Sequence, residues 1–482
     1  MHLLNEKAFV NGEWISAKSN KVLNVNNPAT GEVIGTVPDM NAEDTQKAIE
    51  AASEAFQTWQ DTTAKQRTQY LRKWYDLLVL NQESLVKILT IESGKPLIEA
   101  RGEVVYGNSF IEFFSEEARR IRGEIIASPF ANKKILVEKQ PIGVAGLITP
   151  WNFPHAMITR KAGAALAAGC TCVIKPAEDT PLTALALMQL AAEAGIPKGV
   201  LNVVTSDRRH APEIGNLLCE SPLVAGISFT GSTQIGKLLY RQCSSGVKRI
   251  SLELGGNAPF IVYKSANIDH AVNGAMVSKF RNCGQTCVSA NRFLIQNEVY
   301  DLFVNKLVME IKNLKMGNGI DSGVNIGPLI NKAQLDKVSS LVDDAVSKGA
   351  KLLIGGKQAS QYGELFYEPT VLTDVSENMR VYTEEIFGPV VNIIRFENEE
   401  ESLKIANNTE RGLAGYFYSQ DVAQIFRVSR KLEVGMCGVN EGLISTAEAP
   451  FGGVKESGLG REGSHHGVDD FTHMKYICLG NL

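Results

Sequence analysis

The stretch Val144-Ala-Gly-Leu-Ile148 begins a series of short apolar runs that decides the fold of this chain. A segment of helical character follows each run, and Pro181 and Gly195 suit the first position and the end of one such helix. The later runs are Cys172-Val-Ile174, Val200-Leu-Asn-Val-Val204 and Gly226-Ile-Ser-Phe229. Helices are expected at 155–168, 181–195 and 211–220 and from Ser232. This alternation predicts a doubly wound, mostly parallel sheet over residues 144–254.

A second α/β series begins at Ala258-Pro-Phe-Ile-Val262. Its helices are expected near 267–280, 298–314, 331–348, 399–408 and 421–431, with strands between them. The chain is therefore predicted to be an α/β protein made of two blocks that meet near residue 255.

Three segments lie outside this alternation. Residues 42–60 and 64–92 have the spacing of amphipathic helices, and Asn41 can cap the first of them. Residues 123–143 have the pattern of a hairpin inserted into the first block. The tail Phe471-Thr-His-Met-Lys-Tyr-Ile-Cys478 has the pattern of an exposed strand.

The composition is that of an ordinary globular enzyme of 482 residues, with 44% hydrophobic and 21% charged residues. A net charge of −4 gives no support for nucleic-acid binding, and no apolar run reaches the roughly 18 residues of a membrane span. The 7 histidines form no zinc pattern, so no metal site is expected. The 8 cysteines are too few for a disulfide scaffold, which suits the cytoplasm, or a mitochondrial matrix after removal of a transit peptide.

A cysteine and a glutamate suggest covalent chemistry. Cys287 lies among small and polar residues in Phe280-Arg-Asn-Cys-Gly-Gln-Thr-Cys287, and Glu253 lies in Leu252-Glu253-Leu-Gly-Gly. A thiolate can attack a carbonyl carbon, and a carboxylate can activate the water that releases the product. A lone cysteine is more often a small buried hydrophobic residue, so this interpretation depends on other motifs.

Four further runs supply those motifs: Pro150-Trp-Asn152-Phe-Pro154, Lys175-Pro-Ala-Glu178-Asp-Thr-Pro181, Phe229-Thr-Gly231-Ser-Thr-Gln-Ile-Gly236 and Glu384-Glu385-Ile-Phe387-Gly-Pro389. In order and spacing, nearly the whole chain resembles the NAD(P)-dependent aldehyde dehydrogenases. The resemblance implies a Rossmann-type cofactor-binding domain of residues 1–122 and 144–254 and an α/β catalytic domain of residues 255–468. It also implies a small β oligomerisation arm, made of the hairpin 123–143 and the tail 469–482. A homodimer, or a tetramer built from dimers, is expected.

The resemblance assigns the catalytic roles. Cys287 is expected to be the nucleophile, and Glu253 the base that activates water for hydrolysis of the thioester. Asn152 is expected to stabilise the oxyanion together with the backbone N–H of Cys287, since a side-chain amide donates a hydrogen bond without competing as a nucleophile.

The expected cofactor is NAD, with NADP possible but less favoured. The run from Gly231 to Gly236 is Gly-x4-Gly between a strand and a helix, not the usual Gly-x-Gly-x-x-Gly. Backbone N–H groups at such a helix start can still bind a pyrophosphate. The resemblance implies cofactor contacts from Trp151, Lys175, Glu178, Gly231, Ser232, Gly236, Glu385 and Phe387. A carboxylate at Glu178 would accept hydrogen bonds from the adenosine ribose and repel a 2′-phosphate.

Within the family, the stretches near the C-terminus resemble the succinate-semialdehyde dehydrogenases. The resemblance makes Arg160 and Arg281 the groups that bind the substrate carboxylate and Ser445 a hydroxyl donor. The expected reaction is oxidation of this small-molecule semialdehyde to succinate. Glutarate semialdehyde or another aliphatic aldehyde, a CoA-acylating reaction, and a structural protein without turnover are the alternatives.

One departure from the family concerns a second cysteine. Some relatives carry it two residues after the nucleophile, where this chain has Ser289. Cys283 instead lies four residues before Cys287. A regulatory disulfide between them is a hypothesis if the segment is an irregular loop, whereas a Cys283 that points into the core would be a packing residue.

Overall fold

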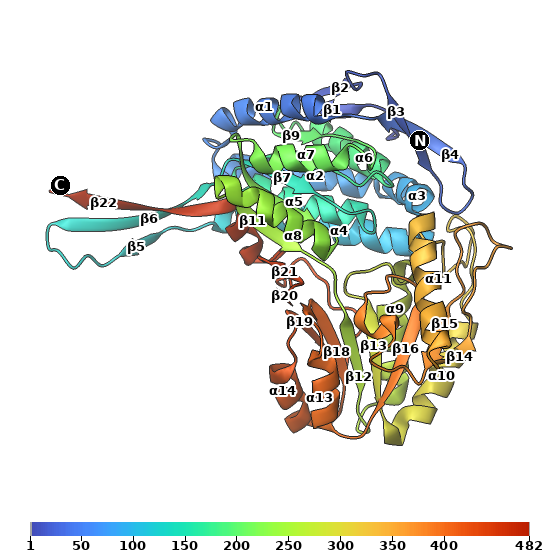
Figure 1. The fold of residues 1–482 in the computed structure, drawn as a ribbon. Coiled ribbons are helices and arrows are strands. Elements are labelled where there is room, and N and C mark those ends of the chain that lie inside the picture. The colour runs from blue at the N-terminus through green and yellow to red at the C-terminus, as the bar shows by residue number, and fades with distance from the viewer. Residues whose placement is uncertain (1, 482) are drawn as a thin grey trace.

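A computed structural model describes residues 2–481 and contains two large sheets and a protruding arm (Figure 1). The first sheet has eight strands. Their spatial order is β2 (Glu13–Ile15), β1 (Ala8–Val10), β9 (Leu201–Val203), β8 (Thr171–Lys175), β7 (Val144–Ile148), β10 (Val224–Thr230), β11 (Arg249–Glu253) and β21 (Gly458–Leu459). Strands β7 to β11 are parallel, as predicted, and the strands at both edges are antiparallel.

The helices predicted for the first block are present. They are α5 (Pro154–Ala168), α6 (Pro181–Glu193), α7 (Ala211–Glu220) and α8 (Thr233–Cys243), with α1 (Ala42–Trp59) at the N-terminal side. Pro181 is the first residue of α6, where its missing N–H costs no hydrogen bond. Strand β7 is apolar along its whole length, and β8 is apolar between Thr171 and Lys175, because helices cover both faces of the sheet.

The single helix predicted over 64–92 is wrong. The segment forms α2 (Ala64–Leu80) and α3 (Gln82–Ser93), with Asn81 outside helical geometry between them. The Asn81 side chain donates a hydrogen bond to the Leu77 carbonyl at 2.9 Å, so it competes with the helical backbone pattern at this point. The helix α4 (Leu97–Glu117), which follows Pro96, was not predicted.

The second sheet has seven strands in the order β14 (Lys351–Ile354), β15 (Thr370–Thr373), β16 (Val390–Phe396), β13 (Ala290–Gln296), β12 (Ala258–Val262), β18 (Ala414–Tyr418) and β19 (Met436–Val439). All neighbours are parallel except β14 and β15. Its helices lie close to the predicted ranges: α9 (Ile268–Phe280), α10 (Tyr300–Lys312), α11 (Lys332–Ser347), α13 (Glu399–Asn407) and α14 (Val422–Lys431), with a short α12 (Arg380–Thr383) in addition.

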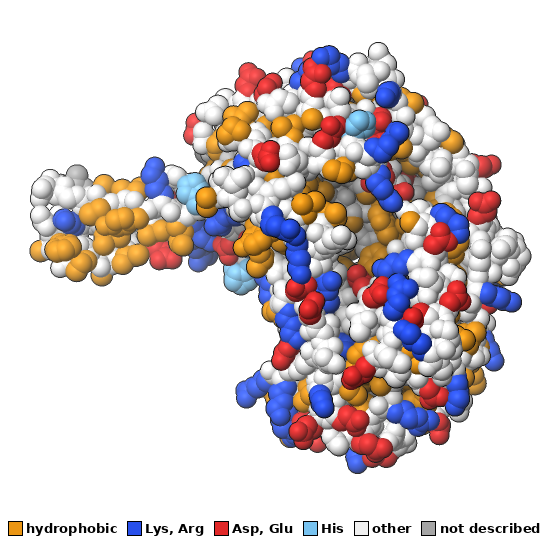
Figure 2. Space-filling model, in the orientation of Figure 1, with side chains coloured by type: hydrophobic (Ala, Val, Ile, Leu, Met, Phe, Trp, Pro, Cys, Tyr) orange, Lys and Arg blue, Asp and Glu red, His pale blue; other side chains and the backbone are white. Residues whose placement is uncertain are grey.

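The arm contains β5 (Glu124–Ile126), β6 (Lys133–Pro141) and β22 (Thr472–Gly480) in one antiparallel sheet that stands away from the body (Figure 1). The tail strand β22 pairs with β6 of the same chain along its whole length, from Thr472 opposite Pro141 to Gly480 opposite Lys133. Large apolar side chains are exposed on the arm, including Ile125, Met474 and Tyr476 (Figure 2).

Smaller pairings complete the described part of the chain. The hairpin β3 (Val22–Asn26) and β4 (Val33–Pro38) and the pair β17 (Arg411–Gly412) and β20 (Val454–Lys455) form two-stranded sheets. Strand β21, from the second block of the sequence, is the last strand of the first sheet, so the C-terminal segment bridges both blocks. No helix within residues 2–481 combines the length and the apolar character needed to cross a membrane.

Candidate active site

A cavity of about 200 Å³ lies where the two blocks meet, and the surface is hollowed between them in Figure 2. Its first wall follows the carboxyl ends of β7, β10 and β11, which is where open α/β sheets bind ligands. The second block supplies Cys287, Glu385 and Phe387. The predicted residues that line this cavity are Trp151, Asn152, Gly231, Ser232, Glu253, Cys287, Glu385 and Phe387.

Cys287 lies between the short 3₁₀ helix η3 (Arg281–Gly284) and β13. Burial raises the pKa of its thiol to about 12, whereas the positive charges of Arg160 and Arg281 act to lower that pKa. The backbone also approaches closely here: a Cβ at Gly256 would lie 2.8 Å from the Cys287 carbonyl oxygen, so this position needs glycine. The backbone is therefore closely packed at Cys287, and the ionisation of the thiol depends on the charges around it.

Glu253 is the last residue of β11, and its side chain is buried. Neither carboxylate oxygen has a hydrogen-bond partner among residues 2–481. Burial raises the pKa of Glu253 well above its ordinary value, and the nearby negative charge of Glu462 raises it further. A buried carboxylate without a partner is costly, and its raised pKa makes it a stronger base when it is ionised.

Glu462 belongs to a buried charged group that the sequence analysis missed. It forms ion pairs with Arg160 and with the adjacent Lys161, and Lys161 also donates a hydrogen bond to the Ser228 hydroxyl at 3.0 Å. The positive charges of Arg160 and Lys161 act to lower the pKa of Glu253. Lys161 and Glu462 lie 301 residues apart, so no local pattern could have paired them.

Asn152 lies near the end of the loop between β7 and α5, and two side chains donate hydrogen bonds to its backbone carbonyl. Lys95 Nζ and Asn282 Nδ2 each donate to the Asn152 carbonyl oxygen at 2.9 Å. Its side-chain Nδ2 donates to the Gln285 carbonyl at 3.2 Å, next to the Cys287 segment. Lys95 forms a buried ion pair with Glu103 of α4, so this helix helps to position the amide.

The turn after β10 contains the predicted phosphate-binding residues. Ser232 is the N-cap of α8, with its Oγ accepting from the Ile235 N–H at 3.4 Å, and the Gly231 N–H donates to the Glu253 carbonyl at 3.0 Å. A side chain at Gly236 would meet that of Leu254, so this glycine allows α8 to pack closely. The N-terminus of α8 thus opens at the cavity, an arrangement that suits an anion.

Glu385 and Phe387 form the opposite wall. Glu385 Oε1 accepts from the Gly256 N–H at 3.1 Å, and burial raises the pKa of its carboxyl group. Phe387 has a left-handed backbone with φ of 58°, and its ring lies edge-on to Trp151 with 5.5 Å between centroids. Strain in a non-glycine residue at a cavity wall indicates a position kept for function.

Lys175 is the last residue of β8 and Glu178 follows the strand, and neither residue lines this cavity. Lys175 is buried, and its Nζ donates to the Pro176 carbonyl at 3.0 Å. Glu178 lines a second hollow of about 750 Å³ beside the β3–β4 hairpin. Its carboxylate accepts a hydrogen bond from Arg208 at 2.8 Å, a partner that the sequence analysis did not predict.

The comparisons with known proteins agree with this geometry. The model of the Aldehyde dehydrogenase family matches residues 14–477. This chain belongs to the aldehyde dehydrogenase family. It is 55% identical to human mitochondrial succinate-semialdehyde dehydrogenase over 100% of this chain and 89% of that protein. It is 53% identical to a glutarate-semialdehyde dehydrogenase of Pseudomonas aeruginosa, over 100% and 99% of the two chains.

Several solved structures have nearly the same fold as this chain. A succinate-semialdehyde dehydrogenase from Burkholderia pseudomallei has a TM-score of 0.98 at 53% identity, and an E. coli NADP-dependent enzyme has 0.98 at 51%; each match covers 100% of this chain and 99% of the other. A Staphylococcus aureus betaine aldehyde dehydrogenase in complex with NAD⁺ has 0.96 at 35%, covering 99% and 96%. These likenesses confirm the predicted aldehyde dehydrogenase fold.

The two arginines predicted to bind substrate differ in their surroundings. Arg160 is fully buried, pairs with Glu462, and lies with its guanidinium carbon 4.3 Å from the centre of the Phe451 ring. Arg281 lies over the Phe153 ring at 5.0 Å and has no carboxylate within ion-pair distance among residues 2–481. Ser445 lies half-buried in the loop after β19. Arg281 therefore has no direct ion-pair partner in the described chain, but its charge acts to lower the pKa of the nearby Glu99, which burial raises.

Cys283 is positioned by a left-handed turn. Asn282 and Cys283 have φ of 52° and 56°, so the segment is not a continuation of α9. Cys283 is nevertheless buried in the apolar core of the second block, where burial raises the pKa of its thiol. All the cysteines are free thiols in this structure. Cys283 thus has the surroundings of the packing residue that the sequence analysis set against the disulfide.

Proposed function

We propose that this protein oxidises succinate semialdehyde to succinate with reduction of NAD. One observation carries the proposal: the thiol of Cys287, the carboxylate of Glu253 and the amide of Asn152 line one cavity, and the positive charge of Arg281 acts on that thiol. The relatives named above that act on semialdehydes support the same substrate class. A substrate that carries its own carboxylate would be held by a guanidinium, which matches carboxylate geometry.

The residues present fit NAD. The exposed N-terminus of α8 with Ser232 would hold the pyrophosphate, and Glu385 has a carboxylate oxygen able to accept from a ribose hydroxyl. Trp151 and Phe387 would contact the nicotinamide, and Lys175 and Glu178 the adenosine ribose. Gly231 and Gly236 leave room for the backbone at this end of the helix. When bound, NAD accepts the hydride that leaves the substrate carbon.

The chain's own residues perform the remaining chemistry. The Cys287 thiolate adds to the aldehyde carbon and forms a thiohemiacetal, whose oxyanion is stabilised by the Asn152 side-chain amide and the Cys287 backbone N–H. Loss of hydride leaves a thioester on Cys287. Glu253 then takes a proton from water, the hydroxide attacks the thioester, and succinate leaves as the thiol is restored.

We propose that Arg281 is the main receptor for the substrate carboxylate. It has no ion-pair partner of its own, whereas Arg160 already balances Glu462. Arg160 contributes positive potential at the thiol, and Ser445 would donate a hydroxyl hydrogen bond. Binding in this way would orient the aldehyde end toward Cys287.

The larger organisation is also part of the proposal. Residues 1–122 and 144–254 would form the cofactor-binding domain and 255–468 the catalytic domain. The hairpin 123–143 and the tail 469–482 would join subunits into a homodimer, or a tetramer of two dimers. Free buried cysteines suit a reducing compartment, the cytoplasm or the mitochondrial matrix.

A substrate series tests the proposed function. NADH absorbance is followed with ω-oxo acids of three to six carbons and with butanal, which lacks the carboxylate. Succinate semialdehyde should give the highest kcat/KM, and butanal should fall below it by about one to two orders of magnitude, because a charge-assisted contact contributes about 1.5–3 kcal/mol. If kcat/KM is highest for glutarate semialdehyde, the substrate is that compound, which is one methylene group longer than succinate semialdehyde. An equal kcat/KM for butanal would show that the enzyme does not recognise the substrate carboxylate.

A further inference from the structure

A buried hydroxyl group without a partner lies near the two arginines predicted to bind the substrate. Tyr106 belongs to α4 and is only partly buried as a residue, but its hydroxyl oxygen is shielded from solvent. This oxygen has no hydrogen-bond partner among residues 2–481. A buried hydroxyl that makes no hydrogen bond costs free energy, and a ligand that supplies the missing acceptor would remove that cost.

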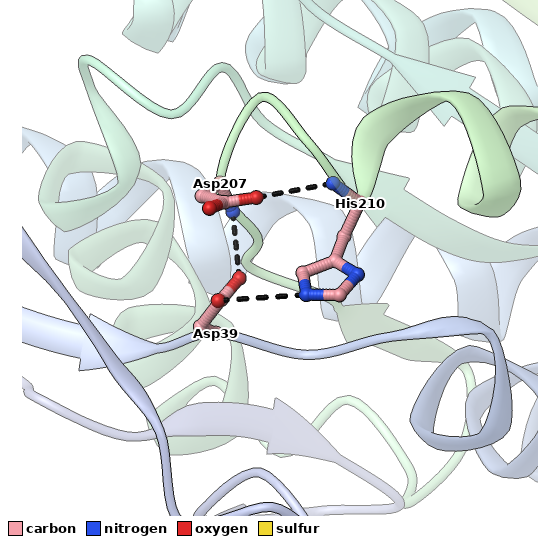
Figure 3. Close-up of side chains that lie close together, drawn as sticks. All are labelled: Asp39, Asp207 and His210. Carbon is pink, nitrogen blue, oxygen red and sulfur yellow. Dashed lines mark hydrogen bonds and ion pairs between the residues drawn. The ribbon is translucent and has the colours of Figure 1, made fainter.

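The situation differs from that of Asp39, Asp207 and His210, which lie close enough together to hold a metal ion (Figure 3). Asp39 Oδ1 accepts from the Asp207 N–H at 2.9 Å, and Asp207 Oδ1 accepts from the backbone N–H groups of Arg209 and His210 at 2.8 and 3.0 Å. His210 Nδ1 lies 2.7 Å from Glu213 Oε1. These contacts support the turn between β9 and α7, so the cluster has a structural explanation that the Tyr106 hydroxyl lacks.

A small apolar cluster connects Tyr106 to both arginines. Tyr106 packs against a group that contains Phe153, the residue before α5, and Met157 of α5. The Arg281 guanidinium lies over the Phe153 ring at 5.0 Å, and Arg160 Nη2 donates to Met157 Sδ at 3.0 Å. Tyr106 therefore packs on the cluster that both arginines touch.

The charges around the hydroxyl agree with this placement. Burial raises the pKa of Tyr106, the positive charges of Arg160 and Arg281 act to lower it, and the charge of a Cys287 thiolate acts to raise it. The hydroxyl is protonated at neutral pH, since its ordinary pKa is already about 10, so it can donate a hydrogen bond. Tyr106 and the two arginines do not line the cavity of about 200 Å³ that contains the proposed NAD site. The carboxylate end of a substrate attached to Cys287 would lie on their side, away from the cofactor.

We propose that the Tyr106 hydroxyl donates a hydrogen bond to the substrate carboxylate and helps to select aldehydes that carry one. Arg281 would supply the charge and Tyr106 a neutral donor, since Arg160 already pairs with Glu462. An aldehyde without a carboxylate leaves the hydroxyl without an acceptor, and a site built to hydrogen-bond a substrate group discriminates against analogues that lack it. This inference rests on the proposed function, because it requires a substrate that carries a carboxylate.

Removal of one oxygen atom tests the proposal. Tyr106→Phe keeps the ring that packs against the apolar cluster and lies 4.9 Å from the Phe110 ring, between centroids. Its kcat/KM for succinate semialdehyde should fall by about 10- to 100-fold, the loss expected for one hydrogen bond to a charged group. Most of this loss should be in KM, because the carboxylate is bound equally in the ground state and the transition state. The kcat/KM for butanal should be nearly unchanged.

Tyr367→Phe is the matched control. The Tyr367 hydroxyl is also buried and without a hydrogen-bond partner in the described chain, but the residue lies in the core of the second block. The charges that act on it are those of Asp343 and Glu368, and not those of the arginines. This variant should match wild type on both aldehydes. Tyr106→Met, which also keeps an apolar side chain, should reproduce the selective loss of Tyr106→Phe.

The outcomes separate this inference from the proposed function. If Tyr106→Phe lowers kcat/KM equally for both aldehydes or changes neither, the hydroxyl does not bind the carboxylate and the inference is overturned. An equal effect of Tyr367→Phe would overturn it as well. In each of these cases, a wild-type preference for succinate semialdehyde leaves the proposed function standing. A wild type that oxidises butanal as well as succinate semialdehyde would refute both.

Discussion

At the scale of single residues, Arg281 and Arg160 share a charge but differ in what surrounds it. Replacing Arg281 by Gln removes a cation that acts on the Cys287 thiol and has no direct ion-pair partner in the described chain. We expect kcat/KM for succinate semialdehyde to fall by about 10- to 100-fold, with butanal oxidation nearly unchanged. Arg160→Gln should instead lower activity on both aldehydes, because it leaves the buried Glu462 with one cation fewer. Steady-state kinetics on both aldehydes checks this, and equal losses with Arg281→Gln would give that residue a structural role.

The pKa of Cys287 predicts how its thiol reacts in the absence of cofactor. Since burial raises this pKa to about 12, the thiol is mostly protonated at neutral pH, and the thiolate fraction grows with pH. Alkylation of Cys287 by iodoacetamide should accelerate by about tenfold per pH unit between pH 7 and 10. Arg281→Gln removes a charge that lowers this pKa, so the variant should react more slowly at each pH. Mass spectrometry of the Cys287 peptide measures the rate separately from that of the exposed Cys478, and a rate independent of pH would contradict the prediction.

The cavity residues Cys287, Glu253 and Asn152, proposed as nucleophile, base and oxyanion stabiliser, could be selected from the sequence because each lies in a short motif of its own. Lys161, Glu462 and Arg208 could not, because their roles come from partners distant in sequence. Arg160 was predicted as a substrate ligand, and no motif showed that Glu462 already pairs with it. Ion pairs between residues that are distant in the sequence can be recognised only in the folded chain.

At the scale of elements, α4 positions the active site although it contributes no residue to the cavity. Its Glu103 side chain forms an ion pair with Lys95. The same carboxylate accepts a hydrogen bond at 3.0 Å from the backbone N–H of His155, at the start of α5. Glu103→Gln would leave Lys95 as an unpaired buried charge, so it should lower the free energy of unfolding by about 3–5 kcal/mol. It should also lower kcat, but by less than the roughly 10²–10³-fold loss expected for Asn152→Ala.

A double variant separates stability from positioning. Lys95→Met with Glu103→Gln removes both charges, so denaturant unfolding should show most of the lost stability restored. The Asn152 carbonyl would still lack the Lys95 donor, so kcat should stay low. Recovery of kcat together with stability would mean that the pair acts only in folding.

The helix α4 also shows where local patterns mislead. Its apolar residues face α2 on one side and α5 on another, so no single stripe marks it in the sequence. The break between α2 and α3 at Asn81 could not be seen in the sequence because the apolar spacing continues across it. The Asn81 side chain ends the first helix through its hydrogen bond to the Leu77 carbonyl. Strand and helix alternation was predictable because parallel strands buried on both faces are continuously apolar.

At the scale of the whole molecule, the arm was predictable as a hairpin and a tail, but its pairing was not. Strands β6 and β22 pair residues that are far apart in the sequence, and Ile125 of the neighbouring strand β5 is 81% exposed. Such apolar surface on an extension calls for a partner. Ile125→Asp combined with Tyr476→Asp should therefore convert the proposed oligomer to monomers in analytical ultracentrifugation. Leu80→Asp, at an exposed position of α2, is the matched control, and an unchanged mass in the arm variant would place the interface elsewhere.

The central claim is that the reaction passes through a thioester on Cys287 that Glu253 helps to hydrolyse. Stopped-flow NADH fluorescence of Glu253→Gln with succinate semialdehyde tests it most directly, with acid quenching and mass spectrometry of the Cys287 peptide. We predict a burst of about one NADH per active site, followed by slow turnover, and a succinyl group on Cys287 during the slow phase. Cys287→Ala should show neither burst nor adduct. A Glu253→Gln enzyme without a burst and without the succinyl group, or a Cys287→Ala enzyme that still turns over, would contradict the account.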